Sequence, residues 1–124
     1  VDGGRRQLAA TVDGIGPNPR AVAIVGREVW VATAGDGRVW VIDGDANRVT
    51  GSVRVGGQPR GITGDGEHLF VTDRKGGRVV EIDPATQEVV GERPVEGGPL
   101  SVIADDQDVW VTRFDAGDVA RITR

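Results

Sequence analysis

Hydrophobic and polar positions alternate over short stretches of this chain, and the same stretches recur three times at a spacing of about 40 residues. Each copy opens on a proline, at Pro19, Pro59 and Pro99, and continues into an apolar triplet. The triplets occupy residues 29–31, 69–71 and 109–111. A glycine turn and a second apolar stretch follow in every copy. The chain is therefore one structural unit repeated three times.

The alternation within the first repeat predicts four strands, separated by turns rich in glycine and aspartate. We expect these strands at residues 20–25, 28–34, 38–43 and 48–55. Large apolar side chains occupy both alternating sets of positions at residues 39–42, as expected of a sheet that is buried on both faces. No apolar period of 3.6 residues persists long enough to predict a helix.

A period of about 40 residues built of short strands is typical of β-propellers, in which a four-stranded blade is repeated around an axis. We therefore expect an all-β, single three-blade unit over residues 1–124, with repeats at 19–58, 59–98 and 99–124. Residues 1–18 match the outer strand of a repeat, and the third repeat lacks its own outer strand. We expect residues 1–18 to complete a blade in a second copy, closing a six-bladed, head-to-tail homodimer. A larger ring and a fragment of a longer propeller remain as alternatives.

Composition and charge narrow the classes of partner. The chain has 15 Lys and Arg against 19 Asp and Glu, a formal net charge of −4, which disfavours a general attraction to nucleic acid. No apolar run approaches the ~20 residues of a membrane-spanning helix. The absence of cysteine excludes disulfides and thiol chemistry. We predict no nucleic-acid partner and no membrane insertion.

Three features invite a chemical interpretation. The segment that starts at Asp43 opens like a calcium-binding loop but has Arg48 and Arg54 where such a loop needs glycine and glutamate, so we expect an Asx turn. His68 aligns with Glu28 at the start of a strand, where we expect a solvent-exposed turn histidine. The three tryptophans align with apolar residues in the other repeats and are expected to pack between blades. We expect no catalytic residue, metal or cofactor.

The repeats resemble those of bacterial YVTN- and NHL-type propellers. The resemblance rests on the phrases at residues 18–22, 28–32, 37–43 and 53–57 and covers almost the whole chain in three copies. Members of this group include six- and seven-bladed proteins, sensor portions of bacterial receptor kinases and streptogramin lyases. The resemblance implies catalytic histidine and glutamate residues with a magnesium ion in the lyases, whereas this chain has a single histidine.

Loops that gather at one mouth of a propeller channel commonly form its binding site. Here that mouth should receive eight residues that vary between repeats. They are Arg20, Arg60, Asp73, Arg74, Lys75, Arg113, Phe114 and Asp115. Five of the eight are basic in a chain that is acidic overall, which favours an anionic small molecule or an acidic peptide as ligand. The alternative is that these are ordinary solvated loop residues.

Three functions are compatible with these residues. The first is a non-enzymatic scaffold, binding or sensing module that assembles into a closed ring and binds its ligand at the channel mouth. The second is part of a propeller enzyme of the streptogramin-lyase or lactonase type, in which channel carboxylates would hold a divalent ion. The third is an excised or engineered half-propeller without a physiological activity.

Overall fold

The structure is a computed structural model that describes residues 7–123, and every regular element in that range is a β-strand. The strands are β1 (Pro19–Val25), β2 (Glu28–Thr33), β3 (Arg38–Asp43), β4 (Arg48–Arg54), β5 (Pro59–Gly64), β6 (Leu69–Asp73), β7 (Arg78–Asp83), β8 (Glu88–Pro94), β9 (Pro99–Ala104), β10 (Asp108–Arg113) and β11 (Asp118–Thr123). The four strands predicted for the first repeat are confirmed to within one residue at each end.

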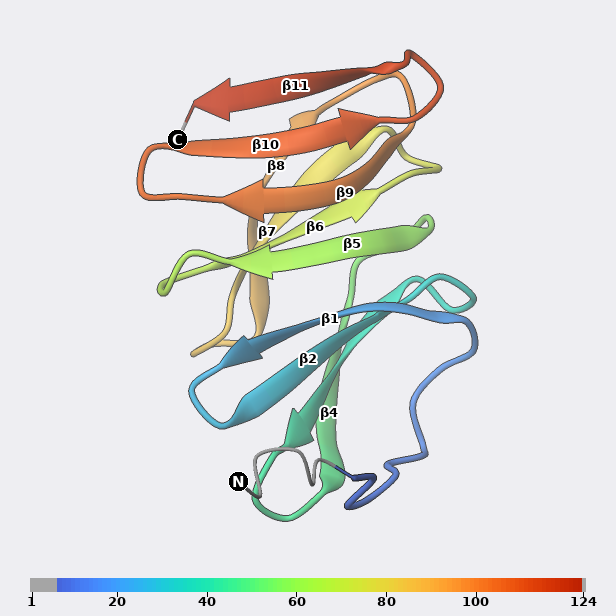
Figure 1. Cartoon of the computed structure of the whole chain (residues 1–124), viewed down its shortest axis with the longest axis vertical. Coiled ribbons are helices and arrows are strands. Elements are labelled where there is room, and N and C mark those ends of the chain that lie inside the picture. The colour runs from blue at the N-terminus through green and yellow to red at the C-terminus, as the bar shows by residue number, and fades with distance from the viewer. Residues whose placement is uncertain (1–6, 124) are drawn as a thin grey trace.

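The strands form three antiparallel sheets that follow one another along the chain. Sheet 1 has the order β1-β2-β3-β4, sheet 2 the order β5-β6-β7-β8, and sheet 3 contains β9, β10 and β11. The three sheets are stacked, and their first strands β1, β5 and β9 lie side by side along the stack (Figure 1). Each sheet therefore runs outward from a shared row of first strands, which is the arrangement expected of blades around a channel.

The hairpins are closed by residues whose backbone suits tight turns. Gly37, between β2 and β3, has a φ of 65°, and a Cβ added there would lie 3.1 Å from a backbone atom of Gly56. Asp43 accepts hydrogen bonds from the N–H groups of Asp45 (2.8 Å) and Ala46 (3.2 Å), so the predicted Asx turn is confirmed.

The core lies between the sheets. We call the face that a sheet turns toward the next sheet along the chain its C-side face, and the opposite face its N-side face. The C-side face of sheet 1, with Trp30 and Val39, packs against the N-side face of sheet 2, with Ile62 and Val71. A second cluster joins sheets 2 and 3 in the same way, with Phe70 on the C-side face of sheet 2. Because both faces of sheet 2 are covered, β6 is buried along its whole length.

The two ends of the stack differ from its middle. Sheet 3 lacks a fourth strand in the described part of the chain, so β11 has a free edge. Residues 7–18 form no strand within the single chain, and residues 1–6 of the expected outer strand lie outside the described residues. Pairing of this segment with a second copy stays a prediction.

Candidate functional site

The candidate site lies along the side of the stack where the first strands β1, β5 and β9 begin. A β-bulge occurs at the start of each of these strands, because Pro19 pairs with Thr33 while Ala21 pairs with Ala32, and the pairing of β5 and β9 shifts in the same way. The residues without a paired position are Arg20 and Arg60 in the first two sheets. Since bulges re-aim side chains, they account for the position of these two arginines at the mouth.

Arg60 is the most unusual of the predicted site residues. Its side chain is half-buried, and its Nε is buried with no hydrogen-bond partner among the described residues. Burial, and then the neighbouring charges of Arg20 and Arg74, lower the pKa of Arg60 below its ordinary value. The guanidinium remains charged, because arginine does not lose its proton in proteins. Three like charges therefore meet here, and residues 7–123 place no carboxylate within ion-pair distance of Arg20 or Arg60.

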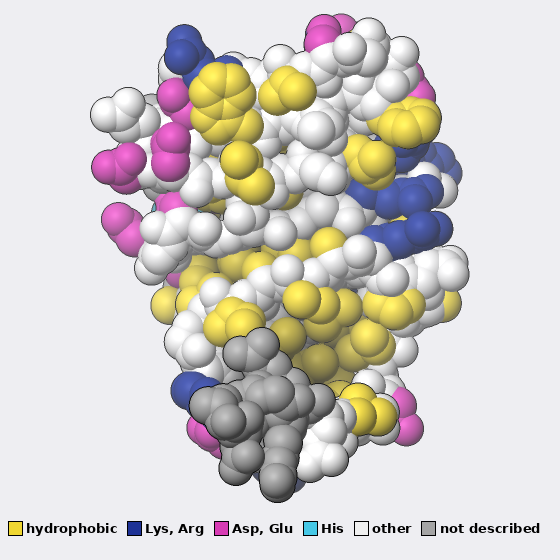
Figure 2. All heavy atoms as spheres, viewed as in Figure 1, with side chains coloured by type: hydrophobic (Ala, Val, Ile, Leu, Met, Phe, Trp, Pro, Cys, Tyr) yellow, Lys and Arg dark blue, Asp and Glu magenta, His cyan; other side chains and the backbone are white. Residues whose placement is uncertain are grey.

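Arg74 joins the mouth residues of sheets 2 and 3. Its Nη2 lies 2.9 Å from a carboxylate oxygen of Asp115, and its guanidinium lies 5.1 Å from the ring centroid of Phe114, a cation–π distance. The ring of Phe114 is mostly exposed, as is Lys75 beside Arg74. Figure 2 shows Lys and Arg side chains gathered as a patch on this side of the stack, at the right of the view, next to hydrophobic side chains. The structure therefore brings together six of the eight predicted residues: Arg20, Arg60, Arg74, Lys75, Phe114 and Asp115.

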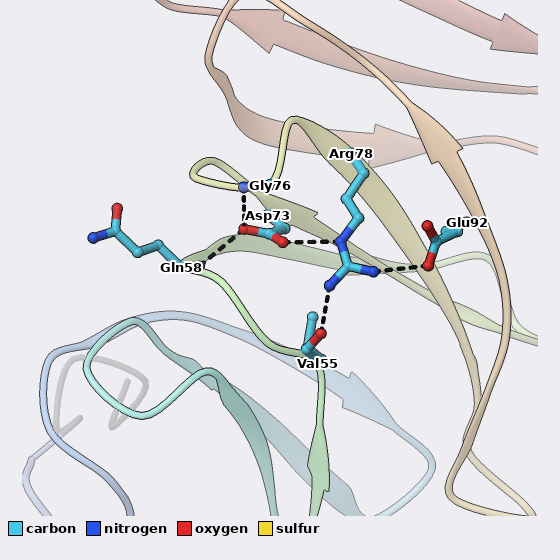
Figure 3. Close-up of polar contacts among 6 residues, drawn as sticks. All are labelled: Val55, Gln58, Asp73, Gly76, Arg78 and Glu92. Atoms are coloured by element: carbon cyan, nitrogen blue, oxygen red, sulfur yellow. Dashed lines mark hydrogen bonds and ion pairs between the residues drawn. The ribbon is translucent and has the colours of Figure 1, made fainter.

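Asp73 has a structural role that the sequence prediction missed. It is 1% exposed, and its carboxylate accepts hydrogen bonds from the N–H groups of Gln58 and Gly76, both at 2.9 Å. Its other oxygen lies 2.9 Å from Nε of Arg78, which also contacts Glu92 and the carbonyl of Val55 (Figure 3). These contacts engage both oxygens of the buried carboxylate.

The pKa of Asp73 reflects the same contacts. Burial alone would raise the pKa of this carboxyl, but the N–H groups of Gly76 and Gln58 and the guanidinium of Arg78 lower it below its ordinary value. The carboxylate is therefore ionised at neutral pH and already paired, so it is not available to a ligand at the mouth.

Arg113 is also committed within its own sheet. Its guanidinium makes two hydrogen bonds of 2.6 Å to Asp118, across the β10–β11 hairpin. Arg113 and Asp118 occupy the same repeat positions as Asp73 and Arg78, so the ion pair of sheet 2 recurs in sheet 3 with its charges exchanged. Comparison of these four positions in the aligned repeats is the signal by which sequence reasoning could have found both pairs.

A groove between sheets 2 and 3 was not foreseen from the sequence. It has a volume of about 270 Å³ and is lined by apolar side chains of both sheets, such as Phe70 and Val109, and by polar or charged side chains that include His68, Glu81 and Arg93. His68 was expected to be exposed in a turn; instead it is half-buried and its Nδ1 contacts a carboxylate oxygen of Glu81. The signal was again in the repeat alignment, because Glu81 and Arg93 replace the buried Val41 and Val53 of the first repeat.

The described residues offer no other site for an ion. Residues 7–123 contain no group of three or more His, Asp and Glu side chains arranged to hold a metal. Within the same range no helix is long and apolar enough to span a membrane.

Comparison of the sequence with models of known families, and with curated protein sequences, gives no match. Solved structures do match the fold. Virginiamycin B lyase from Staphylococcus aureus superposes with a TM-score of 0.76 at 19% identity, over 86% of this chain and 38% of that one. The WD40 β-propeller domain of Doa1 superposes with a TM-score of 0.74 at 13% identity, over 86% of this chain and 36% of that one.

BamB from Moraxella catarrhalis matches with a TM-score of 0.66 at 14% identity, over 83% of this chain and 30% of that one. The chain thus spans less than half the length of each of these structures. Identities this low establish the fold alone, since enzymes and scaffolds share it. With the stacked four-stranded sheets and the repeat of about 40 residues, these likenesses show that the chain is three blades of a β-propeller.

Proposed function

We propose that this chain is a non-enzymatic propeller module that binds an anionic ligand at the mouth formed by Arg20, Arg60 and Arg74. The observation that carries the proposal is Arg60, whose buried Nε has no hydrogen-bond partner among the described residues and whose guanidinium lies near those of Arg20 and Arg74. A buried donor without an acceptor is costly, and so is the approach of like charges. An anion seated here would relieve both costs at once.

The chemistry of the mouth defines the class of ligand. Guanidinium groups bind carboxylate, sulfate and phosphate oxygens through paired hydrogen bonds, which favours these anions over a monatomic one. The exposed ring of Phe114 adds an apolar contact beside the charges. The contact of Arg74 with Asp115 supports carboxylate binding at this place, because a guanidinium of the mouth already donates to a carboxylate oxygen there. An acidic peptide or a small organic anion suits this combination.

Within this proposal, the repeat phrases support a relationship to the YVTN- and NHL-type propellers. The lyase-type alternative has less support from the described residues. The only histidine of the chain, His68, lies in the groove between sheets 2 and 3 rather than at the mouth. The mouth instead presents cations and one aromatic ring, which suits binding.

Isothermal titration with sodium sulfate and with a short poly-glutamate peptide tests the proposal. Arg60→Ala is expected to weaken binding about tenfold or more, since a hydrogen bond from a charged group contributes about 1.5–3 kcal/mol. Arg48→Ala is the matched control, because it removes the same charge at an exposed position at the far end of β4. Equal affinities for the wild type and Arg60→Ala would reject the mouth as the site.

A further inference from the structure

Sheet 3 exposes on its C-side face apolar side chains of the kind that sheets 1 and 2 bury on their C-side faces. Trp110 is 37% exposed and Val119 is 59% exposed, and Ile103 beside them is exposed as well. These residues line a shallow hollow of about 170 Å³ on the open face of sheet 3. Contiguous apolar surface of this kind marks an interaction site more often than chance exposure.

The repeat shows what this surface is built to contact. Trp30 and Val39 occupy the positions of Trp110 and Val119 in sheet 1, where both are 0% exposed and pack against sheet 2. Ala23, in the position of Ile103, packs into the same cluster. Trp110, Val119 and Ile103 therefore match residues of a face that elsewhere in the chain is covered by the N-side face of another sheet, although Arg121 beside Trp110 replaces the buried Val41.

A matching N-side face is exposed at the other end of the stack. Val22 on β1 is 64% exposed, whereas Ile62, in the same position of sheet 2, is 7% exposed and packs against sheet 1. Val102, in the same position of sheet 3, is also buried. Sheet 1 thus exposes along β1 the counterpart of the surface that sheet 3 presents, whereas Val31 and Ile42 on the same face are already buried within the single chain.

A hydrogen bond between sheets 2 and 3 predicts a polar contact at the same place. The hydroxyl of Thr72 accepts the N–H of Gly61 at 2.8 Å and donates to the carbonyl of Leu100 in the next sheet at 2.6 Å. Thr112 occupies the position of Thr72 and accepts the N–H of Ser101 at 2.9 Å. If the N-side face of another sheet 1 covered sheet 3, the carbonyl in the position of Leu100 would be that of Arg20.

We propose that the C-side face of sheet 3 docks on the N-side face of sheet 1 of a second copy of this chain. The contact is head to tail, and two such contacts close a six-bladed dimer. The same docking places residues 8–14 of the second copy beside the free edge of β11. β4 and β8 each form the outer strand of one sheet and lead directly into the first strand of the next sheet, and residues 8–14 stand in the same relation to β1. Thr112 then donates its hydroxyl hydrogen to the carbonyl of the partner's Arg20.

Mass in solution tests the proposal directly, by light scattering across a range of protein concentrations. The wild type is expected at about 26 kDa, twice the 13.0 kDa of one chain. Ile103→Glu and Val22→Lys, each at an exposed position, are expected to remain folded by circular dichroism and to give single chains. Val90→Glu on β8, where the side chain is also exposed, is the matched control and should stay dimeric.

Mixing the two variants gives the decisive result. In a mixed dimer one contact joins Glu at position 103 to Lys at position 22, and the other contact is wild type. An equimolar mixture is therefore expected to recover the dimer that neither variant forms alone. A wild type that stays at 13.0 kDa at every concentration, a dimer that persists in either variant, or a mixture that fails to associate would overturn the proposal.

Discussion

The buried carboxylate of Asp73 should stabilise the chain far more than the other hairpin ion pairs. Asp73→Asn keeps the shape of the side chain but removes the charge that faces Nε of Arg78 and weakens the acceptor for Gln58 and Gly76. Arg78 would then lose its buried anionic partner while its own side chain remains three-quarters buried. The substitution therefore perturbs three contacts, of which the one with Gln58 joins sheet 2 to the link from sheet 1.

The magnitude follows from the burial of the pair. Removing one partner of a buried ion pair costs about 3–5 kcal/mol. Arg78 retains Glu92 and the carbonyl of Val55, and asparagine still accepts one N–H, so we expect a smaller loss of about 2–3 kcal/mol for Asp73→Asn. Asp118→Asn breaks the charge-exchanged pair of sheet 3, whose carboxylate is half-exposed, and should cost much less than Asp73→Asn because solvent screens an exposed pair.

Urea unfolding at pH 7 and one fixed protein concentration measures both losses. The comparison is well matched, because the two carboxylates pair with arginine across equivalent hairpins and differ chiefly in burial. Equal free-energy losses in the two variants, or a loss below about 1 kcal/mol for Asp73→Asn, would refute the assignment of Asp73 to the framework.

Two further predictions follow from the turns and from acid titration. The folded pKa of Asp73 lies below its ordinary value of about 3.9, so its contribution to stability is present above that pH and is lost as the pH falls through the folded pKa. In acid unfolding followed by circular dichroism, Asp73→Asn should therefore lose less stability than the wild type as the pH falls. Gly37→Ala should cost about 1–3 kcal/mol in urea unfolding, because its φ is 65° and its Cβ would press on Gly56. Gly26→Ala, with a similar φ and open space, should cost less; the reverse order would contradict the contact.

The fold could be predicted from the sequence because each repeat contains its own strand and turn signals. Alternation located the strands of the first repeat, and the spacing of the prolines set the period. Both are local properties, and threefold repetition makes each one more certain. The arrangement of three propeller blades needed no information about distant contacts.

The site was only partly predictable, because the burial and ion pairing of its side chains depend on neighbouring strands and loops that the repeat pattern does not identify. Arg20 and Arg60 were placed at the mouth, but the bulges that aim them were not foreseen. Asp73 looked like a mouth carboxylate because it ends a strand, yet the N–H of Gln58, from the preceding link, holds it inside. His68 was misjudged because its partner Glu81 lies on the neighbouring strand.

Titration of the arginine side chains with sulfate, followed by the Nε–H resonances in NMR spectra, tests the anion site most directly. The account predicts that Arg60 responds first, because its Nε–H has no acceptor among the described residues, and that Arg20 and Arg74 follow. Arg78 and Arg113 should not respond, since each makes two hydrogen bonds to carboxylates, whereas Arg74 makes a single contact with the exposed Asp115. Equal responses from all arginines, or no response from Arg60, would contradict the proposal that this propeller binds anions at its mouth.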